Sequence, residues 1–331
     1  MKPEGTMLLT RKDVAALLTI EECIAAIERV FKLHGQGKTV PPGVLGVRAA
    51  DGGFHIKAGL LDLDRSYFAA KINANFPENP KRLGLPTIQG LVMLCDGEYG
   101  SPLAVLDSIE ITIQRTGAAT AVAAKYLAKS DSKTITICGC GNQGRVSVRA
   151  LGKVFSLEKV FAYDVNLAQA QTFAKELANE IGIEVVAVED LENAAGRSDI
   201  VVTCTPAKLP FLKKRFIRSG TFVAAVGADN EEKQELEESL LTESKVVVDV
   251  LDQCTTIGEL HHALQHKLMT PQDVHAELGE VIAGVKAGRI SSDEIIIFDS
   301  TGMALQDVMT ATIIYEKAVK NSVGTVMEFA A

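Results

Sequence analysis

Three glycines between an apolar run and a helical pattern are the residues most clearly arranged for chemistry in this chain. Gly139, Gly141 and Gly144 have the spacing G-x-G-x-x-G, directly after "TITIC" and before a helical periodicity that starts near Gln143. In this spacing the glycines permit a tight turn, a close approach of the backbone to a pyrophosphate, and contact between helix and strand. Because the first N–H groups of a helix can bind phosphate, the loop that contains Asn142 and Gln143 predicts a dinucleotide site.

An acidic residue stands where such a site needs one. Asp164 ends the apolar run "KVFAYD", 20 residues beyond Gly144 (164 − 144), and this separation is typical of a carboxylate that binds the ribose hydroxyls. It would repel a 2′-phosphate, so the pattern favours NAD over NADP. The alternative is a glycine turn followed by an Asp that only caps the next helix. The strand–turn–helix context favours the dinucleotide.

Further polar residues follow the later apolar runs. Thr203 and Thr205 in "TCTPA" are predicted to line the adenosine side of the site, and Val226 lies near the end of "TFVAAVG", where strand ends face the nicotinamide. Asp229 comes just after, with small neighbours that leave room for a substrate. Two interpretations of Asp229 stay open: an acid/base group, or the cap of a helix that begins near Glu231.

Four cations lie in otherwise apolar or strand-like stretches before the glycine loop. They are Arg48, Lys57, Lys71 and Arg115. Each alone could be an ordinary surface charge. Together they suggest a pocket for a carboxylate, because a guanidinium can hold a carboxylate through two hydrogen bonds.

The histidines and cysteines do not form a metal-binding pattern. His262 and His266 share helix spacing in "GELHHALQH", but no carboxylate has the H-E-x-x-H position, so we interpret the segment as a solvated helix face. Cys138 and Cys140 are interpreted as small core residues, because no second Cys/His pair has zinc-like spacing. No metal is expected.

Composition limits the class of protein. The 331 residues suit two domains, and 47% apolar with 23% charged residues suits buried cores. The formal net charge is −8 with the signs mixed, and no basic stripe offers a surface for nucleic acid. A small, water-soluble partner is expected.

The sequence also suggests a compartment. Residues 1–10 lack the apolar stretch of a secretory signal, and no apolar run of about 18 residues could span a bilayer. The six cysteines are scattered, so we expect reduced thiols, a cytoplasmic protein and no membrane partner.

The apolar pattern divides the chain. Residues 12–34 predict a helix, with Thr19 and Glu22 as a capping box, and residues 41–115 read as strands and hairpins, with "DGEYG" as one turn. A small-residue helix is predicted over 116–129. Strands and helices then alternate, which predicts a parallel sheet covered on both faces.

The predicted fold class is therefore α/β, with a Rossmann-type domain over 126–302. The last helix, "MALQDVMTATIIYEKAVK", has no strand predicted after it. It is expected to pack on the first region, giving a discontinuous α+β domain of 1–125 and 303–331 for substrate binding and dimerisation.

An ordered set of motifs spread over nearly the whole chain resembles the ornithine cyclodeaminase/mu-crystallin family, in a layout closest to its archaeal-type alanine dehydrogenase branch. The motifs are "KINANFPENPKRLGLPT", "LAVLDSIEITIQRTGAATAVAAKYLA", "GCGNQG", "GADNEEKQEL", "DVHAELGEVIAG" and "IFDSTGMALQDV". The resemblance implies a homodimer whose contact is formed by the discontinuous domain.

The resemblance also implies roles for residues. Lys71 matches the substrate-carboxylate lysine of the family, Arg48 and Arg115 match its companion arginines, and Asp229 matches its catalytic acid/base aspartate. The residues that fall on cofactor-contacting segments are Thr87, Arg115, Thr116, Gly141, Gln143 and Asp164.

Two departures from the family pattern affect the substrate. Lys57-Ala58 replaces a frequent Met-Pro, and an inward Lys57 could hold a second carboxylate. His55 aligns with the glutamate that handles the distal amine in ornithine cyclodeaminases, which argues against ornithine. "GADNEEK" replaces the commoner "GxDxPGK" but keeps Asp229.

The function predicted is an NAD(H)-dependent L-amino-acid dehydrogenase that works as an imine reductase. Alanine with pyruvate, a cyclic imino acid, and iminosuccinate with aspartate are the candidate substrates. One alternative is an ornithine or lysine cyclodeaminase that recycles its NAD internally. The other is a mu-crystallin-like protein that binds a nucleotide and a small ligand without turnover.

Overall fold

The computed structural model describes residues 5–328, which form two compact units. The first unit contains the described residues up to Val30, Gly37–Arg115 and those from Met303 onward. The second contains Phe31–Gln36 and Thr116–Gly302. The first unit is therefore discontinuous in sequence, and the second is inserted into it.

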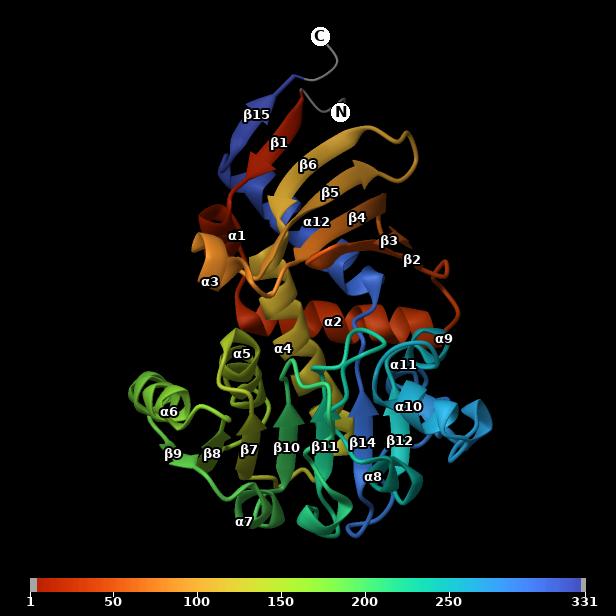
Figure 1. Ribbon diagram of the computed structural model, residues 1–331. Helices are drawn as coiled ribbons and strands as arrows, with labels where there is room; N and C mark the ends of the chain where they lie inside the picture. Colours follow the sequence, from red (N-terminus) through yellow and green to blue (C-terminus); the bar gives the residue numbers. More distant parts are fainter. Residues whose placement is uncertain (1–4, 329–331) are drawn as a thin grey trace. The chain divides into compact units, whose positions relative to one another are not determined.

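The second unit contains an eight-stranded sheet in which every strand pairing is parallel, as predicted. Figure 1 shows most of these strands side by side. In order across the sheet they are β13 Ala276–Glu277, β12 Lys245–Val248, β14 Ile296–Asp299, β11 Phe222–Ala225, β10 Ile200–Thr203, β7 Thr134–Cys138, β8 Lys159–Tyr163 and β9 Glu184–Val188.

The central strands are short runs of β-branched and small apolar residues, and β10, β11 and β14 are buried along their whole length. Such continuous burial is typical of parallel strands covered on both faces. The helical segments between them are α5 Asn142–Leu151, α6 Leu167–Ile181, α7 Leu191–Gly196, α8 Glu238–Thr242, α9 Leu251–Cys254, α10 Glu259–Gln265 and α11 Leu278–Ile282, with 3-10 turns η1 Lys214–Phe216 and η2 Pro271–Asp273.

The first unit contains a seven-stranded sheet that is antiparallel except where β1 pairs with β6. In order across the sheet the strands are β15 Thr325–Met327, β1 Thr6–Leu9, β6 Pro102–Asp107, β5 Ile88–Asp96, β4 Ser66–Asn75, β3 Gly52–Asp62 and β2 Gly43–Ala49. Its helices are α1 Arg11–Leu17, α3 Asn79–Leu83 and α12 Ala304–Asn321, and α2 Ile20–Gly35 and α4 Ser108–Leu127 each continue into the second unit.

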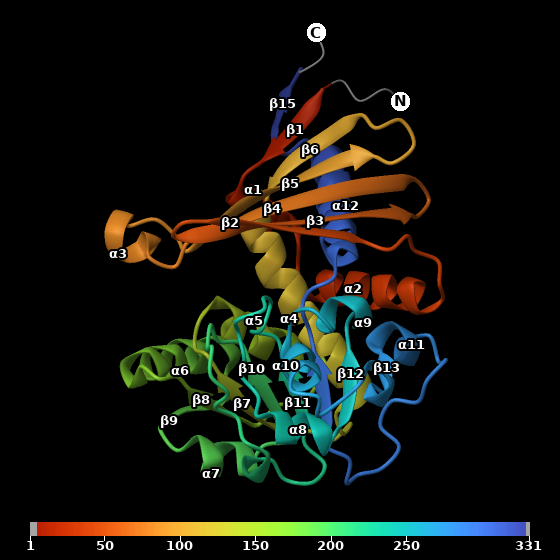
Figure 2. The ribbon, with the colours of Figure 1, turned by 45° about the vertical axis from the view of Figure 1, so that its right-hand side comes forward.

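Helix α12 packs on one face of this sheet, as the sequence predicts (Figure 2). A Cβ on Gly59 of β3 would lie 2.8 Å from the Leu305 side chain, so strand and helix approach closely there. The covered face carries buried side chains such as Leu61, Ala69 and Val92. The alternation of side chains along a strand places Lys57 and Lys71 on this face too.

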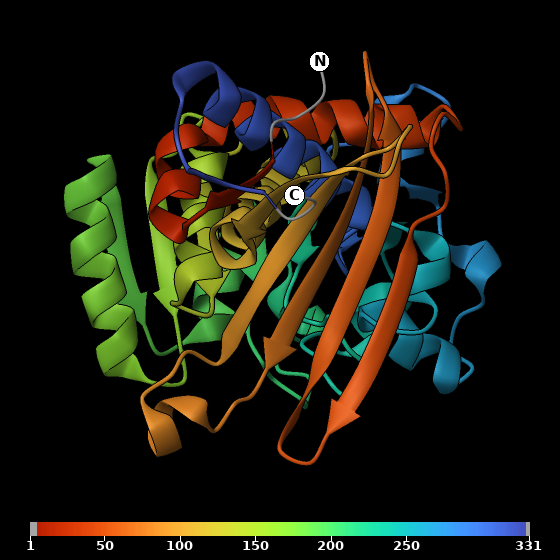
Figure 3. The ribbon, with the colours of Figure 1, turned by 90° about the horizontal axis from the view of Figure 1, so that it is seen from above.

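The opposite face of strands β2–β5 is apolar and exposed. Leu45, Ile56, Ile72 and Leu91 are successive register partners across the four strands, and Leu45, Ile72 and Leu91 are 56%, 48% and 55% exposed. Figure 3 shows the strands from above, with no helix drawn across the visible side of β2–β5. An apolar face of this kind indicates an interaction surface.

Several local predictions are confirmed. The Thr19 hydroxyl accepts the Glu22 N–H at 3.3 Å while Glu22 accepts the Thr19 N–H at 3.0 Å, which is the predicted capping box. The turn "DGEYG" forms, with Asp96 accepting the N–H groups of Glu98 and Tyr99. All six cysteines are free thiols.

Two local predictions are wrong. Residues 108–115 are not a strand but the first turns of α4, because Asp107 caps the Glu110 N–H at 2.9 Å and Ile111 is buried. A strand does follow the last helix: β15 pairs antiparallel with β1.

In the described part of the chain, no helix is both long and apolar enough to cross a membrane.

Candidate functional site

The glycine loop has the geometry that a dinucleotide requires. Gly139 has φ +104°, and a Cβ there would lie 2.9 Å from the Cys204 carbonyl. A Cβ on Gly144 would lie 2.3 Å from the Gly139 carbonyl, whereas one on Gly141 would meet open space. Gly139 and Gly144 thus permit the turn and the helix contact, and Gly141 leaves the loop open to an approaching phosphate.

Helix α5 begins without a capping side chain. Its N-cap is Gly141, so the N–H groups of the first turn have no partner from a capping side chain. The Gln143 Oε1 is buried and has no hydrogen-bond partner among the described residues. Unpaired donors and a buried acceptor at a helix start fit the polar groups of a nucleotide.

Asp164 lies directly after β8, beside the loop. It accepts the Cys140 N–H at 2.9 Å with Oδ2 and the Asn166 N–H at 2.9 Å with Oδ1. The cap of α6 is Asn166, which accepts the Gln169 N–H, so Asp164 is not the capping residue of that helix. Each carboxylate oxygen keeps a further acceptor site for a ribose hydroxyl.

The predicted adenosine-side threonines are held by a buried carboxylate that sequence reasoning did not single out. Glu235 accepts the hydroxyls of Thr203 and Thr205, both at 2.7 Å, the Thr205 N–H at 2.6 Å and the Gly227 N–H at 3.0 Å. A Cβ on Gly227 would lie 2.5 Å from Glu235. Glu235 therefore fixes the loops after β10 and β11, where Val226 also lies.

Asp229 lies in the loop after β11 and is exposed. Its Oδ1 is 2.6 Å from Lys233 Nζ. The predicted helix near Glu231 does not form: the segment is a turn capped by Asn230, which accepts the N–H groups of Glu232 and Lys233. The capping interpretation of Asp229 is therefore wrong, and its carboxylate projects from a turn built by its neighbours.

Three of the four predicted cations converge in the first unit. Lys57 and Lys71 are direct register partners on β3 and β4, on the face covered by α12, and are 8% and 3% exposed. Arg115, in α4, is 7% exposed. We name Lys57, Lys71 and Arg115, with Gln306 and Asp307 of α12, the cation cluster.

One carboxylate lies among these cations. Asp307 Oδ2 is 2.7 Å from Lys71 Nζ, and Asp307 Oδ1 is 3.4 Å from Arg115 Nε. Arg115 Nη1 donates to Gln306 Oε1 at 3.2 Å, while Gln306 Nε2 is buried and has no partner among the described residues. The cluster thus has more cations than anions and an unused donor.

Burial sets the titration of these groups. It lowers the pKa of Lys71 to about 7, an effect that Asp307 opposes and that Arg115 and Lys57 reinforce. Burial alone would raise the pKa of Asp307, but Lys71, Arg115 and Lys57 hold it below its ordinary value. Asp307 is therefore ionised at neutral pH, and Lys71 can exchange its proton there.

The remaining predicted residues lie outside the cluster. Arg48 is exposed on β2. The register partner of Lys57 on that strand is Val44, so Arg48 lies on the same face of the sheet but four residues further along. Thr87 precedes β5 and accepts the Phe76 N–H through its carbonyl. Thr116 is buried in α4, and its carbonyl accepts the Thr120 hydroxyl.

A second group of buried carboxylates lies in the second unit. Glu259 accepts the N–H groups of Glu235 and Leu236 at 2.8 and 3.0 Å. Burial, with Asp249 and Glu235 adding to it, raises the pKa of Asp299 to about 7. We name Glu235, Asp249, Glu259 and Asp299 the acid cluster.

The histidine segment is only partly solvated. His262 is buried, with Nε2 2.8 Å from the Lys233 carbonyl, so the prediction of a fully solvated face is wrong there. His266 is exposed and pairs with Glu238. The described residues contain no group of three or more His, Cys, Asp or Glu side chains that could hold a metal ion.

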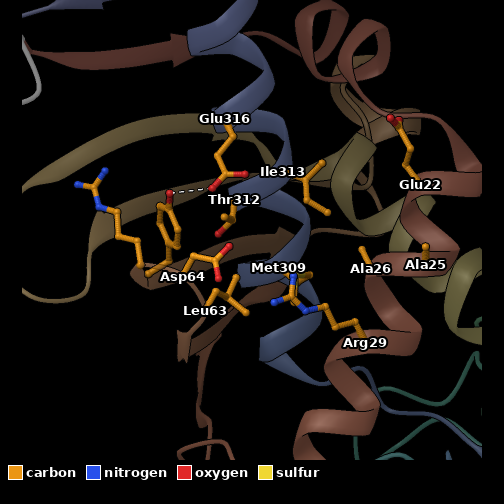
Figure 4. Close-up of a pocket in the computed structure, with 12 residues that line it drawn as sticks. Glu22, Ala25, Ala26, Arg29, Leu63, Asp64, Met309, Thr312, Ile313 and Glu316 are labelled. Carbon is orange, nitrogen blue, oxygen red and sulfur yellow. Dashed lines mark hydrogen bonds between the residues drawn. The ribbon is translucent and has the colours of Figure 1, made fainter. Parts of the chain in front are cut away.

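A cavity of about 460 Å³ lies elsewhere in the first unit, between α2, the β3–β4 turn and α12 (Figure 4). Tyr67 donates to Glu316 at 3.0 Å on its wall, and Arg29 of α2 extends toward Met309. None of the predicted site residues lines it. Helix α12 thus contributes to two separate features, through Asp307 to the cation cluster and through Met309 to this cavity.

Asp307 and Glu235 are the residues that sequence reasoning missed. Both stand in quoted motifs, "IFDSTGMALQDV" and "GADNEEKQEL". The signal in the sequence was an acidic residue beside Gln, Leu or Val in a segment that is otherwise expected to be buried. Acidic side chains are seldom buried unless they have partners.

Comparisons with known proteins agree with these features. The model of the ornithine cyclodeaminase/mu-crystallin family matches residues 4–322. An archaeal alanine dehydrogenase dimer with bound NAD superposes with a TM-score of 0.94 at 39% identity, over 98% of this chain and 99% of that one.

Two further solved structures are similar over nearly the whole chain. The Delta(1)-pyrroline-2-carboxylate reductase of Thermococcus litoralis, in complex with NADH and L-proline, has a TM-score of 0.92 at 36% identity, covering 97% of this chain and 100% of that one. The iminosuccinate reductase of Paracoccus denitrificans, in complex with NAD+, has a TM-score of 0.90 at 30% identity, covering 98% and 100%.

Proposed function

Because the chain belongs to the ornithine cyclodeaminase/mu-crystallin family, we propose that it is an NAD(H)-dependent L-amino-acid dehydrogenase that works as an imine reductase. The observation that carries the proposal is the cation cluster, a buried carboxylate-binding group in the same chain as a dinucleotide loop. The similar proteins that bind NAD or NADH and act on alanine, an imino acid or iminosuccinate support it.

The cofactor is NAD(H) in this proposal, bound by the loop from Gly139 to Gly144 with Asp164 on the ribose. Asp164 supports NAD rather than NADP, because a carboxylate there would repel a 2′-phosphate. When bound, the nicotinamide supplies the hydride donor or acceptor. Thr87 and Thr116 are further proposed contacts.

Lys71 and Arg115, with Arg48 from β2, bind the α-carboxylate of the substrate and orient its Cα. In the oxidative direction Asp229 takes a proton from the substrate ammonium and then positions water for attack on the imine. In the reductive direction the imine carbon gains a hydride, and Asp229 helps to deliver the proton that the nitrogen gains.

Three substrate types remain compatible with a single carboxylate site: pyruvate with ammonia, a cyclic imino acid such as Δ1-pyrroline-2-carboxylate, and iminosuccinate. Assays of NADH oxidation with each compound separate them. Asp229→Asn tests the role of Asp229: we expect turnover to fall by about 10²–10⁴-fold, the usual contribution of general acid–base catalysis. Undiminished turnover in a folded Asp229→Asn protein that still binds NADH would refute that role.

The cyclodeaminase alternative predicts ammonia release from ornithine or lysine without net NADH consumption. His55, in place of a carboxylate for the distal amine, argues against it. The binding-protein alternative predicts tight ligand binding without turnover. The exposed Asp229 carboxylate, held on a turn rather than used as a helix cap, favours an enzyme.

The active form proposed is a homodimer formed by the discontinuous domain, with boundaries near 1–125 and 303–331. The exposed apolar face of β2–β5 supports this contact, and one similar structure is a dimer. Ile72→Lys is expected to dissociate the dimer, measured by light scattering after gel filtration. An unchanged mass for Ile72→Lys would place the contact elsewhere. The six free thiols support a reducing, cytoplasmic location.

A further inference from the structure

We propose that Gln306 of α12 is a substrate-binding residue that donates a hydrogen bond from its side-chain amide to the α-carboxylate of the ligand. This inference rests on the proposed function and deepens it. It adds an uncharged donor to the lysine and arginine already proposed for this carboxylate. It concerns the group that all three candidate substrates share.

Gln306 is a polar side chain in the interior of the first unit. It is 0% exposed and precedes Asp307, whose carboxylate contacts Lys71 and Arg115. Because glutamine side chains are mostly exposed, a fully buried one needs an explanation. Its amide has an oxygen that accepts and an NH2 group that donates, so burial calls for a partner at each end.

Arg115 fixes which way the Gln306 amide points. Arg115 Nη1 lies 3.2 Å from Gln306 Oε1. A guanidinium can only donate hydrogen bonds, so the end of the amide that it meets must be the oxygen. Exchanging the two ends would place one donor against another. The NH2 group of Gln306 is therefore the end that does not face Arg115 Nη1.

This NH2 group has no acceptor in the described chain. Gln306 Nε2 is buried without a hydrogen-bond partner among the residues described, and the adjacent Asp307 carboxylate does not accept from it. Arg115 Nε is similar: it lies 3.4 Å from Asp307 Oδ1 but forms no hydrogen bond within residues 5–328. Buried donors without acceptors are unfavourable in a folded protein.

Two unused donors on side chains that touch each other suit a carboxylate. A carboxylate has two oxygens with about four acceptor sites between them. The positive charges of Lys71 and Arg115 favour an anion here, and hydrogen bonds to an ionised acceptor are stronger than those between neutral groups. An amide donor also binds the anion without adding another buried charge that the unliganded protein would have to accommodate.

An ordered water molecule is the alternative partner for Gln306 Nε2. Such a water would accept from the amide with or without a ligand. It therefore predicts that Gln306 has no effect on the affinity for an amino acid, whereas a direct contact predicts a clear loss when the donor is removed. A binding measurement separates the two cases.

The first test measures binding with two substitutions whose side effects differ. Gln306→Met removes the donor without adding charge, but takes the acceptor from Arg115. Gln306→Glu keeps an acceptor for Arg115, but replaces the donor with a charged group. Isothermal titration of the full-length protein and NAD+ with L-alanine, L-proline and L-aspartate in turn compares both variants with wild type. We expect both to weaken every amino acid that wild type binds by at least about tenfold, the effect of one hydrogen bond to a charged group.

Each other result overturns the inference. A loss in Gln306→Glu alone would assign the effect to the added charge, and a loss in Gln306→Met alone would assign it to the orientation of Arg115. Unchanged affinity in both variants would mean that water satisfies Nε2. Gln171→Glu makes the same chemical change at an exposed position of α6 and should bind like wild type.

A carboxamide ligand distinguishes a lost contact from general damage to the site. The α-carboxamide of an amino acid has an NH2 group in place of one carboxylate oxygen, and the carboxylate of Gln306→Glu can accept from it. We expect the preference of this variant for the acid over its carboxamide to be at least about tenfold smaller than that of wild type. A variant that binds both compounds more weakly in the same proportion would contradict a direct contact.

The second test measures NADH oxidation with pyruvate plus ammonia, Δ1-pyrroline-2-carboxylate, and oxaloacetate plus ammonia. The loss in Gln306→Met should appear mainly in KM, because a contact with the carboxylate is made equally in the ground state and the transition state. A loss confined to kcat would refute a binding role.

The two tests also separate this inference from the proposed function. If wild type binds an amino acid but reduces no imine, the proposed function fails, while the titration still decides the role of Gln306. If wild type reduces an imine and both Gln306 variants bind the amino acid normally, only this inference fails. If wild type binds none of the amino acids and reduces no imine, both fail.

Discussion

The two units bury charge in opposite ways. The cation cluster places Lys57, Lys71 and Arg115 around a single carboxylate, Asp307. The acid cluster holds four carboxylates at the carboxyl ends of the parallel strands, and within the described residues no lysine or arginine forms an ion pair with any of them. One region therefore has an excess of buried positive charge, and the other an excess of buried acidic groups.

The clusters differ in how their charges are satisfied. Glu235 receives two N–H groups and two hydroxyls from its own chain, and Glu259 receives two N–H groups. In the cation cluster, Lys71 and Arg115 both lie beside Asp307, and Arg115 also donates to Gln306. Acids that accept several donors from loops hold those loops in place, whereas buried cations can bind the carboxylate of a ligand.

Among substitutions that test this contrast, the largest loss of stability is expected from Asp307→Asn. It removes the carboxylate from among three buried cations, and leaving buried charge uncompensated costs about 3–5 kcal/mol. Urea denaturation should show this loss, and Lys320→Gln, at the exposed end of α12, should show almost none. Adding Lys57→Met to Asp307→Asn should restore part of the stability, because it removes one of the repelling cations; strictly additive losses would mean that the cluster is not coupled.

Glu235→Gln tests the other side of the comparison. An amide can accept with one end only, so the N–H of Thr205 or of Gly227 loses its acceptor, at a cost of about 1–3 kcal/mol. Because Glu235 holds the loops beside the proposed cofactor site, we also expect weaker NADH binding, measured by fluorescence titration. Unchanged stability and binding would show that the acid cluster is not structural.

The pH dependence of activity and of stability tests the titration of Lys71 in the cation cluster. Lys71 gives up its proton near pH 7 in the folded protein, so kcat/KM for a carboxylate substrate should fall as the pH rises above about 7. The unfolded chain keeps this proton up to about pH 10.5, so unfolding takes up a proton between these values and stability should rise with pH across that window. Lys71→Arg should move the fall in kcat/KM to higher pH and abolish the stability gain, because arginine stays charged. A profile of Lys71→Arg identical to that of wild type would assign the transition to another group.

The smallest effect is expected from Thr203→Val. This substitution keeps the shape and removes one of the four donors to Glu235, so we expect a loss of about 1 kcal/mol in the free energy of unfolding. The pH dependence of kcat/KM should not change. A shift of that profile in Thr203→Val would connect the acid cluster to the proton chemistry.

Much of the second unit could be predicted from the sequence, because its signals are local. The glycine spacing, the runs of β-branched residues and the distance to Asp164 are visible within a short stretch of chain. In the first unit, the helix over 108–115 was missed because Ile111 and its β-branched neighbours favour a strand, while the helix depends on the Asp107 cap and on burial.

The cation cluster could be predicted only in part. Lys57, Lys71 and Arg115 were recognisable as cations in apolar surroundings. Asp307 was not, because its cationic partners lie on other elements and nothing in its own buried segment of α12 reveals them. Only the packing of α12 against β3 and β4 brings it to 2.7 Å from a lysine more than 200 residues earlier (307 − 71).

The pairing of β1 with β15 has a consequence for engineering. Since the first and last strands lie together in one sheet, the ends of the chain can be joined by a short peptide and the polypeptide reopened between Gly302 and Met303. In such a circular permutant the split unit becomes one segment that is interrupted only by Phe31–Gln36. Residues after Arg115 could then be deleted to ask whether the sheet and α12 fold, and bind a carboxylate, without them.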